Sequence, residues 1–104
     1  MSELTAPEAN RLLYADHAAI YDQTEHCIAK PQVRDLLDGI LTRALAACGS
    51  EQPLVLDACG GTGNVSELLA RRGITTTVAD VSPEMLAQWR AKAERLGIVT
   101  ETLE

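Results

Sequence analysis

A glycine-rich turn lies between two apolar segments that each end in a carboxylate. Residues 55–64 read Val-Leu-Asp-Ala-Cys-Gly-Gly-Thr-Gly-Asn, so an apolar run delivers Asp57 to a turn of small residues. A second apolar run, residues 77–79, ends in Asp80. Small residues let a ligand approach the backbone closely, and βαβ units place a ribose-binding acid at this distance beyond the first turn. The pattern predicts a nucleoside cofactor site.

Two cofactor classes fit this pattern, a pyrophosphate dinucleotide such as NAD and S-adenosylmethionine. A dinucleotide places its dianionic pyrophosphate at the N-terminus of the helix after the turn, where the carboxylate of Asp57 would repel it. S-adenosylmethionine carries an ammonium, a sulfonium and one carboxylate. An acid beside the turn is then favourable, while backbone N–H groups receive the carboxylate. The charge at Asp57 therefore favours the methyl donor over NAD.

Two helices are predicted before the turn. The first begins at Thr5, which has the spacing of a capping box with Glu8, and a bend within it is compatible with its sequence. The second begins at Pro31, carries apolar residues at helical spacing and ends at Gly49. This second helix is the clearest amphipathic helix in the sequence.

Three strands and two further helices are predicted after Gly49. Residues 54–56, 74–79 and 98–103 are rich in apolar and β-branched residues and predict strands, the first of them covered on both faces. One intervening helix is expected to begin at Asn64 with a second capping box to Glu67, and the other to begin after Ser82. Right-handed crossovers place the strands side by side, so the predicted fold class is α/β, a parallel β-α-β-α-β sheet preceded by two helices.

Composition and charge restrict the class of protein. The 104 residues are 46% hydrophobic, which is typical of one small globular unit. A net charge of -6 does not indicate a basic surface that would bind nucleic acid or an anionic membrane. No apolar stretch has the length of a bilayer span or the form of a secretory signal. Cys27, Cys48 and Cys59 lack CxxC spacing, so no disulfide framework and no metal site is expected. We expect a cytoplasmic protein with free thiols.

Three segments resemble class I S-adenosylmethionine-dependent methyltransferases, which have a Rossmann-like sheet. Residues 56–63 resemble motif I of that family, an acid followed by G-x-G-x-G, and residues 78–86 look like its second motif, whose acid binds the ribose hydroxyls. Residues 14–22 are similar to a helix that packs over the cofactor in many small-molecule methyltransferases. The resemblance implies S-adenosylmethionine as the cofactor and these binding residues: Tyr21, Asp57, Ala58, Cys59, Gly60, Gly61, Gly63, Asp80, and, beside the adenine, Val81 and Met85.

The turn departs from the family pattern at its first glycine, which is Cys59 in this chain and is followed by Gly60. We expect the turn to keep its shape by exchanging which of the two residues adopts the permissive backbone conformation. Three aromatic residues also have structural interpretations. Tyr14 and Tyr21 are each as suited to core packing as to cofactor contact, and Trp89 is expected in the core.

The resemblance implies that residues 1–104 are a partial methyltransferase domain. Residues 5–48 would form its N-terminal helices and residues 53–104 the cofactor-binding half of the sheet, with the acceptor-binding face lying outside this sequence. We expect transfer of a methyl group to a small molecule, with no activity from residues 1–104 alone, and no catalytic residue can be named. Alternative functions are a non-catalytic nucleotide-binding or interaction module and an NAD-binding Rossmann unit. An incomplete sheet exposes strand 54–56, which predicts self-association or pairing with a completing second chain.

Overall fold

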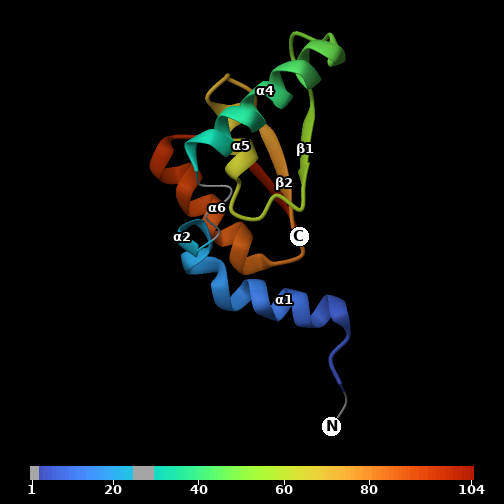
Figure 1. The fold of residues 1–104 in the computed structure, drawn as a ribbon, viewed down its shortest axis with the longest axis vertical. Helices are drawn as coiled ribbons and strands as arrows, with labels where there is room; N and C mark the ends of the chain where they lie inside the picture. The colour runs from blue at the N-terminus through green and yellow to red at the C-terminus, as the bar shows by residue number, and fades with distance from the viewer. Residues whose placement is uncertain (1–2, 25–29) are drawn as a thin grey trace.

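The computed structural model describes residues 3–24 and 30–104 and has the α/β order that the sequence predicts (Figure 1). Cys27 lies outside the described residues, so the expectation that it is a free thiol concerns a part of the chain that is not described. The elements in order are α1 (Ala6–His17), the 3₁₀ turn η1 (Ala18–Ile20), α2 (Tyr21–Thr24), α4 (Pro31–Cys48), β1 (Val55–Ala58), α5 (Asn64–Ala70), β2 (Thr76–Ala79), α6 (Pro83–Leu96) and β3 (Glu101–Leu103).

The three strands form one parallel sheet in the order β1-β2-β3. Each strand begins later than its sequence predicts, and β1 also ends later. Because Ala58 still pairs with Ala79 of β2, the strand continues past Asp57, which lies inside β1 and not at its end. The predicted topology is confirmed, whereas the predicted bounds of the strands are not.

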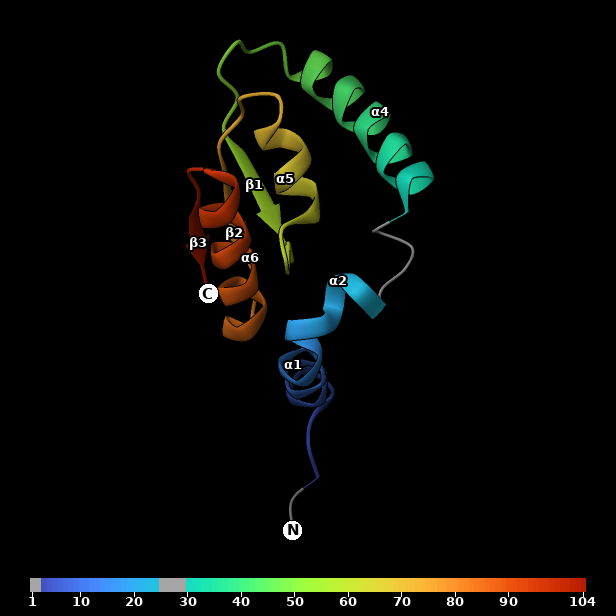
Figure 2. The same ribbon diagram turned by 90° about the vertical axis from the view of Figure 1, so that its left-hand side faces the viewer.

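Helices α5 and α6 cover the same face of the sheet. Alternate residues of β2 point to one side, where Thr76 donates a hydrogen bond to Ser66 of α5 and Val78 packs against Trp89 of α6. Figure 2 shows α5, and beyond it α4, on one side of β1. On the other face Leu56 is 60% exposed. The prediction that the first strand is covered on both faces is therefore wrong for the described residues, since both crossover helices pack on one side.

The hydrophobic core lies between β2 and α6. The indole of Trp89 is fully buried there, as predicted, and its Nε1 donates to Oγ1 of Thr100 at 3.0 Å. Helix α6 begins as predicted, because Oγ of Ser82 accepts from the backbone N–H of Met85. The core consists of Val78, Leu86, Trp89 and Ala93, with Ile98 packed against it.

The N-terminal helices lie outside this core. Helix α1 begins with the predicted capping box between Thr5 and Glu8, and the predicted bend is the change from α1 through η1 to α2. Helix α1 lies at the C-terminal ends of the strands, where it contacts α6 (Figure 2). Helix α4 ends at Gly49 as predicted and is attached to α5 by an ion pair of 2.9 Å between Arg34 and Glu67. No helix in residues 3–24 and 30–104 is long and apolar enough to cross a membrane.

Gly63 fixes the turn after β1 against the core. Its φ is +78°, and a Cβ atom built on it would lie 2.1 Å from Cε3 of Trp89. Both the backbone conformation and the lack of space require glycine at this position. The turn therefore approaches the indole as closely as backbone atoms allow.

We predict that Gly63→Ala lowers the free energy of unfolding by more than about 3 kcal/mol, because it adds overpacking to backbone strain. Gly73→Ala is the matched control: φ is +77° at Gly73, but a Cβ there would meet nothing within 4 Å. Strain alone should cost the control about 1 kcal/mol after the entropic gain in the unfolded chain. Urea unfolding measures both variants, and equal losses would contradict the close packing of Gly63 on Trp89.

Candidate cofactor-binding site

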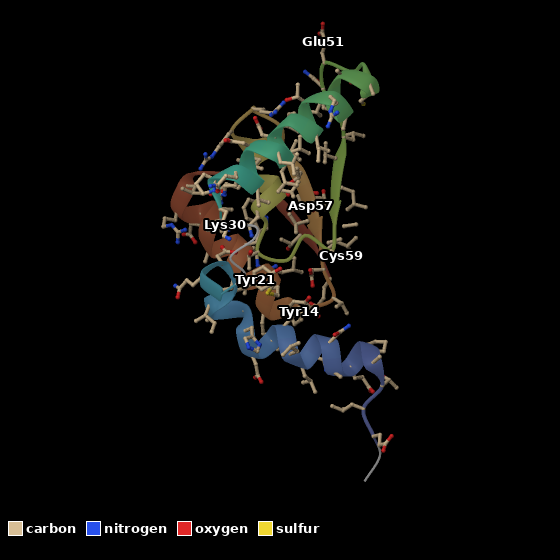
Figure 3. All side chains as sticks on the ribbon, in the orientation of Figure 1. Tyr14, Tyr21, Lys30, Glu51, Asp57 and Cys59 are labelled. Atoms are coloured by element: carbon tan, nitrogen blue, oxygen red, sulfur yellow. The ribbon has the colours of Figure 1, made fainter. Side chains whose placement is uncertain are left out.

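A cavity of about 450 Å³ lies where β1 and β2 end, between the following turns and helix α1 (Figure 3). The turn after β1 and the segment after β2 form its floor, and residues of α1 and α2 form what we call the roof. The predicted binding residues other than Gly63 all line it: Tyr21, Asp57, Ala58, Cys59, Gly60, Gly61, Asp80, Val81 and Met85.

Gly63 is the one predicted binding residue that does not line the cavity, because it packs on Trp89. The cavity also includes residues outside this predicted set, of which the sequence indicated cofactor contact only for Tyr14, as an alternative to core packing. Three of them could have been found from the helical spacing of the sequence, because Asn10, Arg11 and Tyr14 come from adjacent turns of one face of α1. The additional residues are Asn10, Arg11, Tyr14, Asn64 and Val65.

The carboxylate of Asp80 joins the two turns that form the floor. Its Oδ2 accepts a hydrogen bond from the backbone N–H of Gly61 at 2.9 Å, and its Oδ1 accepts one from the N–H of Ser82 at 2.9 Å. Each carboxylate oxygen can accept two hydrogen bonds, so this arrangement leaves acceptor capacity for a ligand hydroxyl. Asp80 can both hold the floor together and bind a ligand.

The carboxylate of Asp57 is oriented by α5. Its Oδ2 accepts from Oγ of Ser66 at 2.7 Å, and Oγ of Ser66 in turn accepts from Oγ1 of Thr76 at 2.6 Å. Gly60 leaves room for this carboxylate, because a Cβ on Gly60 would lie 2.8 Å from Cγ of Asp57 and 2.7 Å from Cγ1 of Val78. Asp57 is therefore held in one position beside the turn.

Cys59 corrects the expectation about the first glycine of the turn. Cys59 itself has a φ of +57°, whereas Gly60 has no positive φ. The expected exchange between the two residues does not occur, because Cys59 itself adopts the strained left-handed backbone conformation. Gly60 is needed for a different reason, since a Cβ atom there would clash with Asp57. The thiol of Cys59 is free and exposed at the cavity.

Two tyrosines of the roof face the floor (Figure 3). The ring centroids of Tyr14 and Tyr21 are 6.1 Å apart with planes tilted by 55°, a favourable arrangement for two aromatic rings. Tyr14 is 41% exposed, so it is a cavity residue and not a core residue. The roof thus presents an aromatic surface of the kind that packs against a planar ligand.

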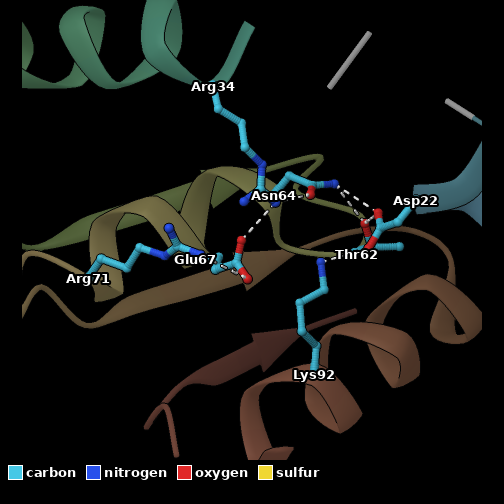
Figure 4. A network of polar contacts seen from close by, with 7 residues as sticks. All are labelled: Asp22, Arg34, Thr62, Asn64, Glu67, Arg71 and Lys92. Atoms are coloured by element: carbon cyan, nitrogen blue, oxygen red, sulfur yellow. Dashed lines mark hydrogen bonds and ion pairs between the residues drawn. The ribbon is translucent and has the colours of Figure 1, made fainter. Parts of the chain in front are cut away.

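Asp22, next to Tyr21, connects the roof to the floor (Figure 4). It accepts hydrogen bonds from Thr62 and Asn64 and pairs with Lys92. Burial by itself would raise the pKa of Asp22, but the bonds from Lys92, Thr62 and Asn64 hold that pKa below its ordinary value. The carboxylate is therefore ionised at neutral pH.

The side chain of Asn64 does not cap α5. The residue at the N-cap is Gly63, which makes no side-chain cap, and Asn64 is the first residue of the helix. Its Nδ2 donates to Asp22, and Glu67 instead forms ion pairs with Arg34 and Arg71. The predicted second capping box is wrong, because tertiary contacts with α2 and α4 take both of its side chains.

Comparisons with known proteins place this chain beside methyltransferases. Residues 55–104 match a family model described as a methyltransferase domain. Uncharacterized proteins of Mycobacterium bovis and Mycobacterium tuberculosis are each 30% identical over 101 residues, which cover 96% of this chain and 36% of the relative. The chain therefore spans about a third of the length of these relatives.

A solved structure shares the fold. It is an S-adenosylmethionine-dependent methyltransferase from Clostridium acetobutylicum, with a TM-score of 0.63 and 23% identity over 88% of this chain and 36% of that one. These matches give no support to the NAD-binding alternative. Among the described residues, no group of three or more His, Cys, Asp and Glu side chains is placed to hold a metal ion.

The backbone at Cys59 gives a testable prediction. Cys59→Gly should raise the free energy of unfolding by about 0.5 to 1 kcal/mol, since relief of the left-handed strain exceeds the entropic cost of glycine. Cys59→Val should lower it by about 1 kcal/mol or more, because a β-branched residue tolerates positive φ least. Cys59→Ser, which retains the Cβ without branching, is the control and should differ little from the parent. Thermal and urea unfolding measure all three, and a destabilised glycine variant would contradict this backbone assignment.

Proposed function

We propose that this chain, whose residues 55–104 match a family model described as a methyltransferase domain, binds S-adenosylmethionine in the cavity between roof and floor. It would supply the cofactor-binding part of an enzyme that transfers a methyl group to a small molecule. The observation that carries the proposal is the convergence of Asp57, Asp80 and the glycine-rich turn on one cavity.

The residues around the cavity fit this cofactor. Its volume of about 450 Å³ lies within the range of small-molecule sites. A Cβ on Gly61 would lie 3.0 Å from Cε of Met85, so glycine keeps the floor open for a ligand. Asp57 and Asp80 place negative charge where a sulfonium and an ammonium are favourable and a pyrophosphate is not. The chemistry of the site thus supports the methyl donor over NAD.

Each group has a proposed task. Asp80 would accept hydrogen bonds from the ribose hydroxyls, Val81 and Met85 would contact the adenine, and Tyr21 would cover the ligand from the roof. Asp57 would favour the positive end of the ligand. When bound, S-adenosylmethionine supplies an electrophilic methyl group on its sulfonium. The contribution of these residues is to bind and orient it, which lowers the barrier by proximity.

We also propose a cytoplasmic location. Cys48 and Cys59 are free and exposed thiols, which is typical of proteins in a reducing compartment.

The free edge of β1 supports a proposal about partners. Within the described part of the chain this strand pairs with β2 alone; Leu54, just before it, and Leu56, within it, are 101% and 60% exposed. An apolar edge with unpaired backbone groups is a template for another strand. We propose that β1 pairs with a strand of a second copy when no other chain completes the sheet.

Calorimetric titration with S-adenosylhomocysteine, with NAD as the negative control, tests the cofactor. Asp80→Ala should weaken binding of S-adenosylhomocysteine by about 1 to 3 kcal/mol, because buried hydrogen bonds to the ribose are lost. Asp80→Asn is the milder variant in case alanine unfolds the floor. Glu84→Gln removes a nearby acid that does not line the cavity and should bind like the parent. A folded parent chain that binds NAD, or neither ligand, would refute the proposed cofactor.

Light-scattering chromatography across a dilution series tests the edge of β1. The parent chain should elute as a concentration-dependent mixture of monomer and dimer, and Leu56→Lys should shift it to monomer, because a charge on an exposed edge opposes pairing. Leu12→Lys changes an exposed leucine of α1 and should leave the equilibrium unchanged. A parent chain that is monomeric at every concentration would contradict self-association.

A further inference from the structure

Asp22 bonds to groups on both sides of Gly63 and to α6. Its Oδ1 accepts from Oγ1 of Thr62 at 2.6 Å and from Nδ2 of Asn64 at 3.0 Å, while its Oδ2 lies 2.8 Å from Nζ of Lys92 (Figure 4). One carboxylate of the roof is therefore held by three groups of the floor and the core helix.

The side chains that bond to Asp22 are buried and preorganised. Thr62 is 2% exposed, and Asn64 and Lys92 are each 8% exposed. Asn64 is itself held by Thr62, whose Oγ1 accepts from its Nδ2 at 3.0 Å. Hydrogen bonds from such preorganised groups to an ionised carboxylate are stronger than those between neutral groups. These three side chains therefore form a preorganised binding site for the carboxylate of Asp22 on α2.

Asp22 does not line the cavity, whereas its neighbour Tyr21 does. Helix α2 begins at Tyr21 and follows α1 through η1, so fixing Asp22 also fixes the aromatic pair of Tyr14 and Tyr21 above the floor. A ligand that contacts both roof and floor binds only to those protein molecules in which the roof is docked on the turn after β1. Its apparent affinity then falls in proportion to the docked fraction.

We propose that Asp22 is a positioning residue for the cofactor: it docks the roof on the turn after β1 and so sets the affinity of the cavity without touching the ligand. The proposal rests on the proposed function for the identity of the ligand. The docking itself is a property of the chain in the absence of ligand.

The test uses variants that leave no buried charge unpaired. Asp22→Ala combined with Lys92→Met removes both members of the ion pair, while Thr62 and Asn64 remain bonded to each other. Asp22→Asn combined with Lys92→Met is the conservative variant, since its amide oxygen still accepts from Thr62. Asp16→Asn removes an exposed acid of α1 and is the control for charge alone.

Calorimetry with S-adenosylhomocysteine, urea unfolding and amide hydrogen exchange are measured on each chain. The alanine double variant should keep an unfolding midpoint near that of the parent and bind about tenfold more weakly, as expected when about a tenth of the molecules are docked. The asparagine double variant should recover part of the affinity, and Asp16→Asn all of it. Amides of α1 and α2 should exchange faster in the alanine double variant, with those of α6 unchanged.

The outcomes separate the two proposals. A parent chain that fails to bind S-adenosylhomocysteine refutes the proposed function, and the exchange of α1 and α2 then decides whether Asp22 docks the roof. A parent chain that binds, with an alanine double variant of equal affinity and equal exchange, overturns the positioning role. Weaker binding accompanied by equal loss of protection in α6 also overturns it, because the effect would then be general destabilisation.

Discussion

The close approach of Gly63 to the indole of Trp89 is the contact on which the site depends. It fixes the turn after β1 on the core at the distance of backbone atoms, which no other residue type permits. Thr62 and Asn64 on either side are thereby directed toward Asp22, and the preceding Gly61 toward Asp80. A contact that belongs to the core thus decides where the ligand-facing groups lie.

The two acids that line the cavity, Asp57 and Asp80, both make structural hydrogen bonds that would also orient them toward the proposed ligand. Asp80 accepts from the backbone of both turns, and Asp57 accepts from Ser66 of α5. Because both are oriented in the absence of a ligand, binding of the proposed ligand would need little further ordering of these side chains. The same bonds make it difficult to remove either acid without loosening the floor.

The sequence predicted the features that depend on neighbouring residues and on hydrophobic periodicity. It missed the features that depend on contacts between residues far apart in the chain. The caps of Thr5 and Ser82 and the order of strands follow from short-range patterns, and all were confirmed. The capping box at Asn64 failed because Asp22, far away in the chain, takes its side chain. The conformation of Cys59 could not be read from its type, since positive φ is imposed on it by the turn. The family resemblance supplied most of the residues that line the cavity, but it missed Asn10, Arg11, Asn64 and Val65. It also placed Gly63 among the binding residues, whereas Gly63 packs on Trp89.

The chain order of the strands has a consequence for how the molecule assembles. Each strand pairs with the next one along the chain across a single helix, so the sheet and its core need only short loops to close. The roof is different, because α1 contacts α6 near the other end of the sequence. Its docking requires the longest loop closure described in this fold, and we expect it to be a late event in folding. The floor would then exist before the roof that covers it.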